Sequence, residues 1–174
     1  VDCFLTVNAV GTVSAETALI ARFDDSTGAA TVSGAGSLLS TDSFFVVGAG
    51  GTGTLEIDAG GQVTTFSGTL GLSRDSTGSV TVSGAGSEWD NRFELFVGRD
   101  GTGMLTVDNG GRVETGSLFA SLSDLHGDGT IVTEGGVLDA DLVFDATTGA
   151  RNTLSFGSGG TLRMFAVQAS NDAF

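Results

Sequence analysis

The sequence repeats itself, and this periodicity constrains the fold more than any other feature. The segment TVSGAGS occurs at 31–37 and again at 81–87, and VGAGGTGTLEIDAGGQV at 47–63 returns as VGRDGTGMLTVDNGGRV at 97–113. These matches define a 50-residue period, and 25-residue blocks also align without a gap. Such a repeat predicts that one supersecondary unit stacks on the next. The predicted blocks are 2–26, 27–51, 52–76, 77–101 and 102–126, then two irregular blocks at 127–149 and 150–164, and a tail at 165–174.

Within each block, apolar residues alternate with polar ones, which is the two-residue period of a β-strand. The fourth and sixth positions of the blocks are the clearest inward-facing columns. Three further columns are expected later in the block, and Glu88 and Arg22 are unusual members of two of them, which suggests that these columns lie near an edge or corner. The five expected columns are Leu5, Ala30, Leu55, Val80 and Leu105; Val7, Val32, Ile57, Val82 and Val107; Val13, Leu38, Val63, Glu88 and Val113; Ile20, Phe45, Leu70, Leu95 and Ala120; and Arg22, Val47, Leu72, Val97 and Leu122.

A single block of this size, with two or three short strands, cannot bury an apolar face alone, but stacked blocks share a continuous core. The sequence therefore predicts an all-β fold, a single parallel β-helix (β-solenoid) domain over residues 1–174 with about seven layers. A glycine column at the tenth position of the blocks fits corners that need a positive φ or a close approach between layers. The absence of proline agrees, because proline would remove a hydrogen-bond donor from a central strand.

The segments TGSVTVSGAGSEW, LFVGRDGTGMLTVDNGGRV and TGTLEIDAGGQV resemble the glycine-rich β-helix repeats of bacterial autotransporter passenger regions and related large secreted, adhesin-like surface proteins. The resemblance covers about residues 2–165. It implies an extracellular, right-handed parallel β-helix with an adhesive or structural role. No β-barrel translocator lies within these residues, so the resemblance does not define the secretion route.

The charge of the chain narrows its range of partners. Its 21 acidic residues stand against 7 arginines, which gives a formal charge of −14. Such a charge repels nucleic acid and anionic membrane surfaces, and no apolar run predicts insertion into a membrane. The single cysteine, Cys3, cannot form an internal disulfide; it is expected to be a half-buried spectator thiol, with an intermolecular bond as the alternative.

Three aspartates, Asp25, Asp75 and Asp100, share one block position in the segments DDSTG, RDSTG and RDGTG. Stacked carboxylates of this kind are candidate ligands for calcium, the one cofactor that the sequence suggests. Two observations favour the alternative that they only form turns: the column is interrupted by Gly50, and Arg74 and Arg99 can neutralise their neighbours.

Trp89, Asp90 and Arg92 lie in the densest ionisable stretch of the chain, EWDNRFE. A tryptophan flanked by charged residues is a candidate platform for a surface polysaccharide, which makes a carbohydrate-binding or polysaccharide-cleaving β-helix the second interpretation of function. The alternative is that Trp89 packs at a corner, as Leu39 does one long period earlier.

Other chemistries find less support in the sequence. His126 and Cys3 lie too far apart in the chain to suggest a zinc set or a Cys-His pair, and no serine sits in a nucleophile elbow. The threonine column Thr27, Thr52, Thr77 and Thr102 raises ice binding, but each threonine is expected at a corner before a glycine rather than on a flat face.

The leading hypothesis is therefore a secreted, non-enzymatic structural or adhesive solenoid that assembles end to end. Exposed strand edges at the terminal layers would recruit strands of another copy and form a homopolymer. The alternative is that the chain is part of a longer passenger whose neighbouring layers cover these edges. The expected assembly residues are Leu5, Val7, Phe165, Val167 and Phe174.

Overall fold

The computed structural model describes residues 2–138, 142–144 and 152–164. Their regular elements are strands, apart from one 3-10 turn, η1 (Leu122–Asp124). The strands are β1 (Asp2–Val7), β2 (Thr12–Ala15), β3 (Ala18–Ile20), β4 (Thr27–Ser33), β5 (Leu38–Thr41), β6 (Phe44–Val47), β7 (Thr52–Asp58), β8 (Gln62–Thr65), β9 (Ser67–Leu70), β10 (Thr77–Ser83), β11 (Glu88–Val97), β12 (Thr102–Asp108), β13 (Arg112–Ala120), β14 (Leu125–His126), β15 (Thr130–Leu138), β16 (Leu142–Phe144), β17 (Asn152–Phe156) and β18 (Gly160–Met164).

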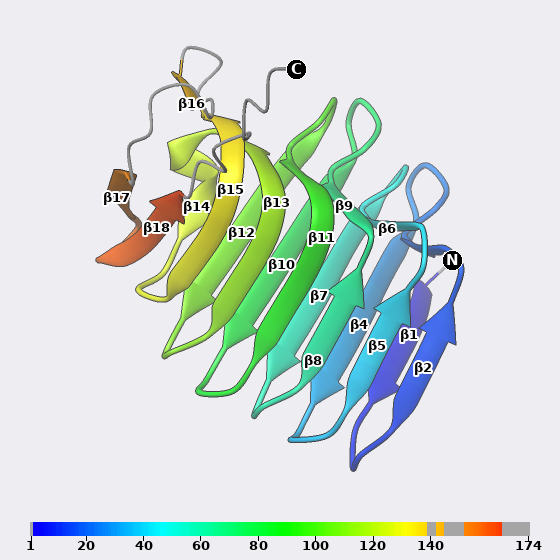
Figure 1. The fold of residues 1–174 in the computed structure, drawn as a ribbon. Coiled ribbons are helices and arrows are strands. Elements are labelled where there is room, and N and C mark those ends of the chain that lie inside the picture. Colours follow the sequence, from blue (N-terminus) through cyan, green and yellow to red (C-terminus); the bar gives the residue numbers. More distant parts are fainter. Residues whose placement is uncertain (1, 139–141, 145–151, 165–174) are drawn as a thin grey trace, which may run out of the picture.

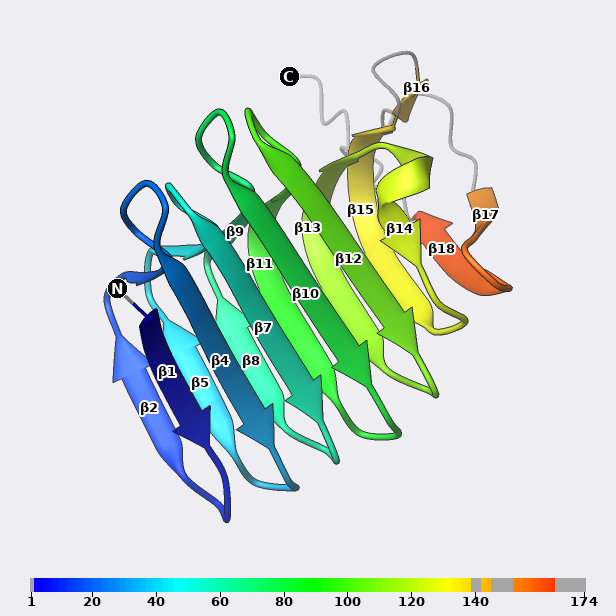
Figure 2. The ribbon, with the colours of Figure 1, turned by 180° about the vertical axis from the view of Figure 1, so that it is seen from behind.

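The strands wind into a β-solenoid of about five stacked parallel coils, which confirms the predicted fold class. One face is a six-stranded sheet in the order β1-β4-β7-β10-β12-β14. The other is a twelve-stranded sheet that folds around a bend, with β2, β5 and β8 before the bend and β3, β6 and β9 after it, whereas β11 and β13 run through it. Figures 1 and 2 show the two faces lying against each other with the coils in sequence order. We number the coils 1 to 5 by their first strands, β1, β4, β7, β10 and β12.

The six-stranded sheet has the 25-residue register that the sequence predicts. Thr27 pairs with Thr52, Thr52 with Thr77, and Thr77 with Thr102. The two inward columns of these strands are also confirmed, since the side chains of Val32, Ile57, Val82 and Val107 are fully buried. The period shortens after coil 5, because β14 pairs Leu125 with Leu105, which is closer along the chain than one 25-residue block.

The twelve-stranded sheet does not keep the 25-residue register. Before the bend, Val13 pairs with Leu39, Leu39 with Val63, Val63 with Trp89, and Trp89 with Val113. The separation of paired residues along the chain is therefore alternately one residue more and one residue less than 25. After the bend, Ile20 pairs with Val47, Val47 with Leu70, and Leu70 with Val97. Here the separation of paired residues along the chain is alternately two residues more and two residues less than 25.

This alternation explains the 50-residue period. In each coil, the first corner follows the strand of the six-stranded sheet, the second corner is the bend, and the third leads to the next coil. Coils 2 and 4 each have one extra residue at the first corner and one at the second. Their third corners, 48–51 and 98–101, are two residues shorter than 21–26 and 71–76 of coils 1 and 3. The differences cancel over each coil, so every strand of the six-stranded sheet from β4 to β12 begins in register with the one before it.

Three of the expected inward columns are therefore wrong. One of them groups Val47 and Val97 with Arg22 and Leu72, whereas the strands pair Val47 and Val97 with Leu70. Leu39 and Trp89, rather than Leu38 and Glu88, stand in line with Val63. Ile20 and Leu70 face Val47, not Phe45. Phe45 instead belongs with Gly68 and Leu95. The glycine column is also split: Gly36 and Gly86 have positive φ, whereas the positive φ of coils 3 and 5 falls one residue earlier, at Gly60 and Gly110.

The core lies between the two sheets and runs the length of the stack. Its largest fully buried side chains are Trp89, Phe45, Leu39, Leu55, Ile57, Leu70, Leu95, Leu105, Leu118, Leu125 and Ile131. At the C-terminal end the parallel stacking gives way to antiparallel pairs, β16 with β15 and β17 with β18.

Gly86 provides a test of the corner geometry. Its φ is +84°, and an added Cβ would find room, with Gly60 Cα at 3.6 Å. Any penalty for Gly86→Val must then come from backbone strain, which for a β-branched residue in this region costs about 1–3 kcal/mol. We expect the melting temperature of Gly86→Val to fall clearly below that of Ser79→Val, which places the same side chain in the extended strand β10. Equal melting temperatures would contradict the assignment of Gly86 to a left-handed corner.

Candidate functional site

Trp89 lies inside the solenoid, so it cannot be a platform for sugars. Its side chain is fully buried, its ring packs edge-on against Phe45 at a centroid distance of 6.3 Å, and its Nε1 donates to Thr65 Oγ1 at 3.0 Å. Gly68 makes room for the indole, because a Cβ at that position would lie 2.8 Å from Trp89 Cζ2. The carbohydrate interpretation of Trp89 is therefore wrong, and the alternative, that it packs as Leu39 does, is confirmed.

This burial has a direct spectroscopic consequence. We expect the emission of Trp89 to be blue-shifted and resistant to acrylamide, because the indole is shielded from solvent. Addition of acidic polysaccharides should leave the emission unchanged. Efficient quenching in a protein that remains folded by circular dichroism would contradict the buried position.

A ladder of polar side chains crosses the core at the bend of the twelve-stranded sheet. Thr65 Oγ1 donates to Asn91 Oδ1 at 2.8 Å, and Asn91 Nδ2 donates to Thr115 Oγ1 at 3.0 Å. The Thr115 hydroxyl in turn lies within hydrogen-bond distance of the carbonyl oxygens of Phe93, at 3.2 Å, and Ser117, at 3.1 Å. The ladder thus connects three coils and reaches the backbone of the bend in coil 4.

Replacement of the central member tests the value of this ladder. Asn91→Leu removes the acceptor of Thr65 and the donor to Thr115, and each buried polar group left without a partner costs about 1–3 kcal/mol. We expect a loss of stability in that range by denaturant unfolding, and almost none for Thr64→Val, which changes a half-buried side chain on the adjacent residue of β8. Equal stabilities of the two variants would mean that the ladder contributes little.

The bend itself carries an unusual arrangement of aromatic rings. In β11 the register against β13 shifts between Asn91 and Glu94, so Arg92 and Phe93 together oppose the single residue Gly116. The ring of Phe93 stacks on that of Phe66 in coil 3, with centroids 5.4 Å apart and planes 10° from parallel. Both rings face solvent, with 46% of Phe66 and 55% of Phe93 exposed. A bulge of this kind re-aims side chains and is common beside binding sites.

Two adjoining hollows lie on the C-terminal side of this ring stack. The smaller, about 170 Å³, is lined by Arg92, Phe93, Glu94, Gly116 and Ser117, and we call it the notch. The larger, about 310 Å³, shares Arg92 and Gly116 with the notch and extends between Asp90 and Glu114 to Val132 of β15.

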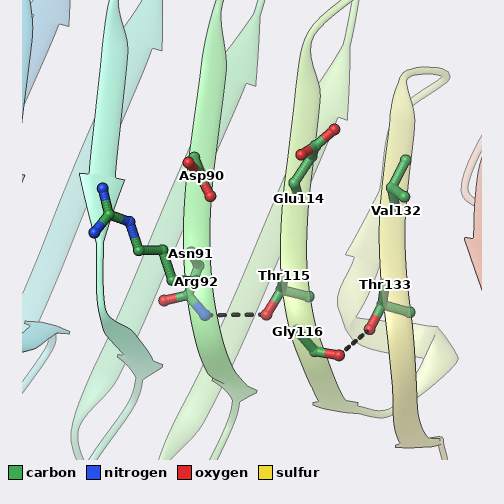
Figure 3. A pocket seen from close by; sticks show the side chains of 8 residues that line it. All are labelled: Asp90, Asn91, Arg92, Glu114, Thr115, Gly116, Val132 and Thr133. Atoms are coloured by element: carbon green, nitrogen blue, oxygen red, sulfur yellow. Dashed lines mark hydrogen bonds between the residues drawn. The ribbon is translucent and has the colours of Figure 1, made fainter. Parts of the chain in front are cut away.

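Figure 3 shows how the charged groups of the larger hollow lie. The Asp90 and Glu114 carboxylates stand on the neighbouring strands β11 and β13, whereas the Arg92 side chain reaches in the opposite direction, toward β8. Glu114 forms an ion pair with Arg112, which also pairs with Glu88 at 3.3 Å. The structure thus places Asp90 and Arg92, two of the three predicted carbohydrate contacts, on this surface without Trp89.

The three predicted calcium ligands do not come together. Asp25 and Asp75 occupy equivalent positions in the six-residue third corners of coils 1 and 3, both with positive φ, whereas Asp100 lies in a four-residue corner of coil 4. Asp25 and Asp75 line one polar hollow with Arg74, and Asp100 is not part of it. In the described parts of the chain, no three His, Cys, Asp or Glu side chains are arranged to hold a metal ion. The left-handed φ of Asp25 and Asp75 agrees with the turn-forming alternative.

The remaining predicted residues are spread over the molecule. Leu5 is 39% exposed and Val7 is buried in β1, whereas Phe165, Val167 and Phe174 lie outside the described residues. Cys3 is exposed on the same strand, so the prediction that its thiol is half-buried is wrong. Thr27, Thr52, Thr77 and Thr102 begin strands of the six-stranded sheet, so their expected placement at corners is wrong. His126 pairs with Thr106 in β14.

Comparison with models of known protein families, with curated proteins and with solved structures finds no match to this chain. Within the described residues, the structure contains no helix that is long and apolar enough to span a membrane.

Proposed function

We propose that this chain is part of a secreted, non-enzymatic β-solenoid with a structural or adhesive role on a bacterial surface or in the extracellular matrix, and that its coils wind right-handedly through about seven layers. The repeat supports the structural part of this proposal, because its regular positions coincide with the inward columns and corners that allow one coil to stack on the next. The acidic charge of −14 suits a protein that must stay soluble and avoid anionic surfaces.

We further propose that solenoids of this type stack end to end. The observation that supports this proposal is that coil 1 has an unpaired strand edge and partly exposed apolar side chains. Within the described chain, β1 pairs only with β4, so its other edge presents unpaired backbone groups. Leu5 and Leu19 are 39% and 41% exposed, although the residues that pair with Leu5 along the ladder, Ala30 and Leu55, are 3% and 2% exposed.

An apolar hollow of about 170 Å³ opens beside these residues and reaches Leu39 and Phe45 in the core. A parallel coil of another copy would pair with the edge of β1 and cover this hollow, in the same way that each coil covers the one before it. The two ends of the stack differ: at the C-terminal side the six-stranded sheet ends with the two-residue strand β14, and the twelve-stranded sheet ends with antiparallel β17. The tail residues Phe165, Val167 and Phe174 remain the predicted donors for this contact.

A charge introduced at the end of the core tests the proposal. Leu5→Lys places an ammonium group where the next coil would stack, but at a position already open to solvent, so the fold should persist. We expect the unmodified chain to form concentration-dependent assemblies in sedimentation velocity and linear particles in negative stain, and Leu5→Lys to remain monomeric.

The matched control is Phe4→Lys, which adds the same charge one residue earlier on the outer face of β1, where Phe4 is 74% exposed. This variant should assemble as the unmodified chain does. A monomeric unmodified chain, or identical assembly by both lysine variants, would overturn the end-to-end mechanism.

A further inference from the structure

The ring stack at the bend is interrupted at a position where the repeat would continue it. Position 116 lies one 50-residue period after Phe66 and is therefore its equivalent in coil 5, but it is a glycine. Phe66 covers one face of the Phe93 ring. The opposite face points along the solenoid toward coil 5, where Gly116 has no side chain to cover it and the notch opens instead.

The floor of the notch is set by close backbone packing. A Cβ at position 116 would lie 2.9 Å from the carbonyl oxygens of both Arg92 and Phe93, so the backbone of coil 5 sits directly against the bulge. The bulge is also fixed from both sides: Phe93 N donates to the Phe66 carbonyl at 2.9 Å, and the Phe93 carbonyl faces the Thr115 hydroxyl of the core ladder. The Phe93 ring is thus presented by a backbone held on two sides, which reduces the entropy lost on binding.

The groups around the notch are polar on every side but one. Phe93 supplies a single apolar face, and the side chains of Glu94 and Ser117 supply acceptors and a donor at its rim. A pyranose ring has this combination of surfaces, since its C–H groups stack on an aromatic face while its hydroxyls take part in hydrogen bonds around the edge.

The charges of the rim narrow the choice of sugar. Asp90 and Glu94 stand beside the notch and the adjoining hollow, and the Arg92 guanidinium extends away from them toward β8 (Figure 3). A uronic acid placed against Phe93 would meet these carboxylates. We propose that the notch binds one pyranose unit of a neutral polysaccharide, stacked on the free face of Phe93, with neighbouring units lying in the hollow between β11 and β13.

Affinity electrophoresis provides the test, with hydroxyethyl cellulose, galactomannan and dextran as neutral probes and polygalacturonate as the anionic probe. At least one neutral probe should retard the unmodified chain, and polygalacturonate should not. Phe93→Leu, which removes the aromatic face but keeps an apolar side chain, should weaken the retardation about tenfold.

Phe23→Leu is the matched control, because it alters another exposed phenyl, 68% exposed and located in a third corner far from the notch. It should bind as the unmodified chain does. Should Phe93→Leu unfold, Glu94→Phe serves in its place: Phe44 occupies the equivalent position of coil 2, so the repeat tolerates the ring, which would obstruct the notch.

Three outcomes would overturn the proposal: no retardation by any neutral probe, retardation by polygalacturonate alone, or equal retardation of folded Phe93→Leu and the unmodified chain. The end-to-end mechanism is independent of this result, since it rests on Leu5 at the other end of the stack.

Discussion

The parallel ladder between successive coils is the interaction on which the rest of the structure depends. Each coil must bring three strands level with those of its neighbour, about 4.8 Å away, or the backbone groups of the core lose their partners. Corner lengths are therefore coupled around a coil. When coils 2 and 4 gain a residue at each of two corners, the third corner loses two, and β7 and β12 begin in register. The stacking requirement acts on the sum of the corners rather than on each corner alone.

The same coupling explains what could be predicted from the sequence. From β1 to β12 the six-stranded sheet was predictable, because these strands recur with a constant 25-residue spacing and no second period obscures their alternation of apolar and polar residues. The twelve-stranded sheet was not, because a gapless 25-residue alignment averages over corners of unequal length. It therefore placed Leu38 and Glu88 in the core instead of Leu39 and Trp89, and it grouped Asp100 with Asp25 and Asp75. Aligned on the 50-residue period, Leu39 falls on Trp89 and Asp25 on Asp75, so the longer period already contained the correct register.

The ring stack was missed for a related reason. Phe66 and Phe93 fall at different positions of the 25-residue blocks, although the bulge at Arg92 and Phe93 brings their rings to 5.4 Å. The fully buried indole of Trp89 was equally hard to anticipate, because the polar sequence around it suggests a surface. Its burial depends on Gly68 and on the hydroxyl of Thr65, which come from the preceding coil and are not sequence neighbours. Stacking contacts of this kind become visible only when the register is known.

Because stacking requires apolar side chains at the inward positions, the coils differ from one another mainly at their corners and outer faces. Ala30, Leu55, Val80 and Leu105 form one column of buried apolar side chains. The bend, by contrast, carries Asp42 and Ser43 in coil 2, Phe66 in coil 3, Arg92 and Phe93 in coil 4, and Gly116 in coil 5. In coils 3 to 5, the polar ladder through Asn91 fixes the backbone beneath these residues without specifying which side chains project from it. At bend positions other than Gly116, substitution can therefore create or abolish a surface site at little cost to the core, which is the condition under which a regular solenoid can acquire a ligand in a single coil.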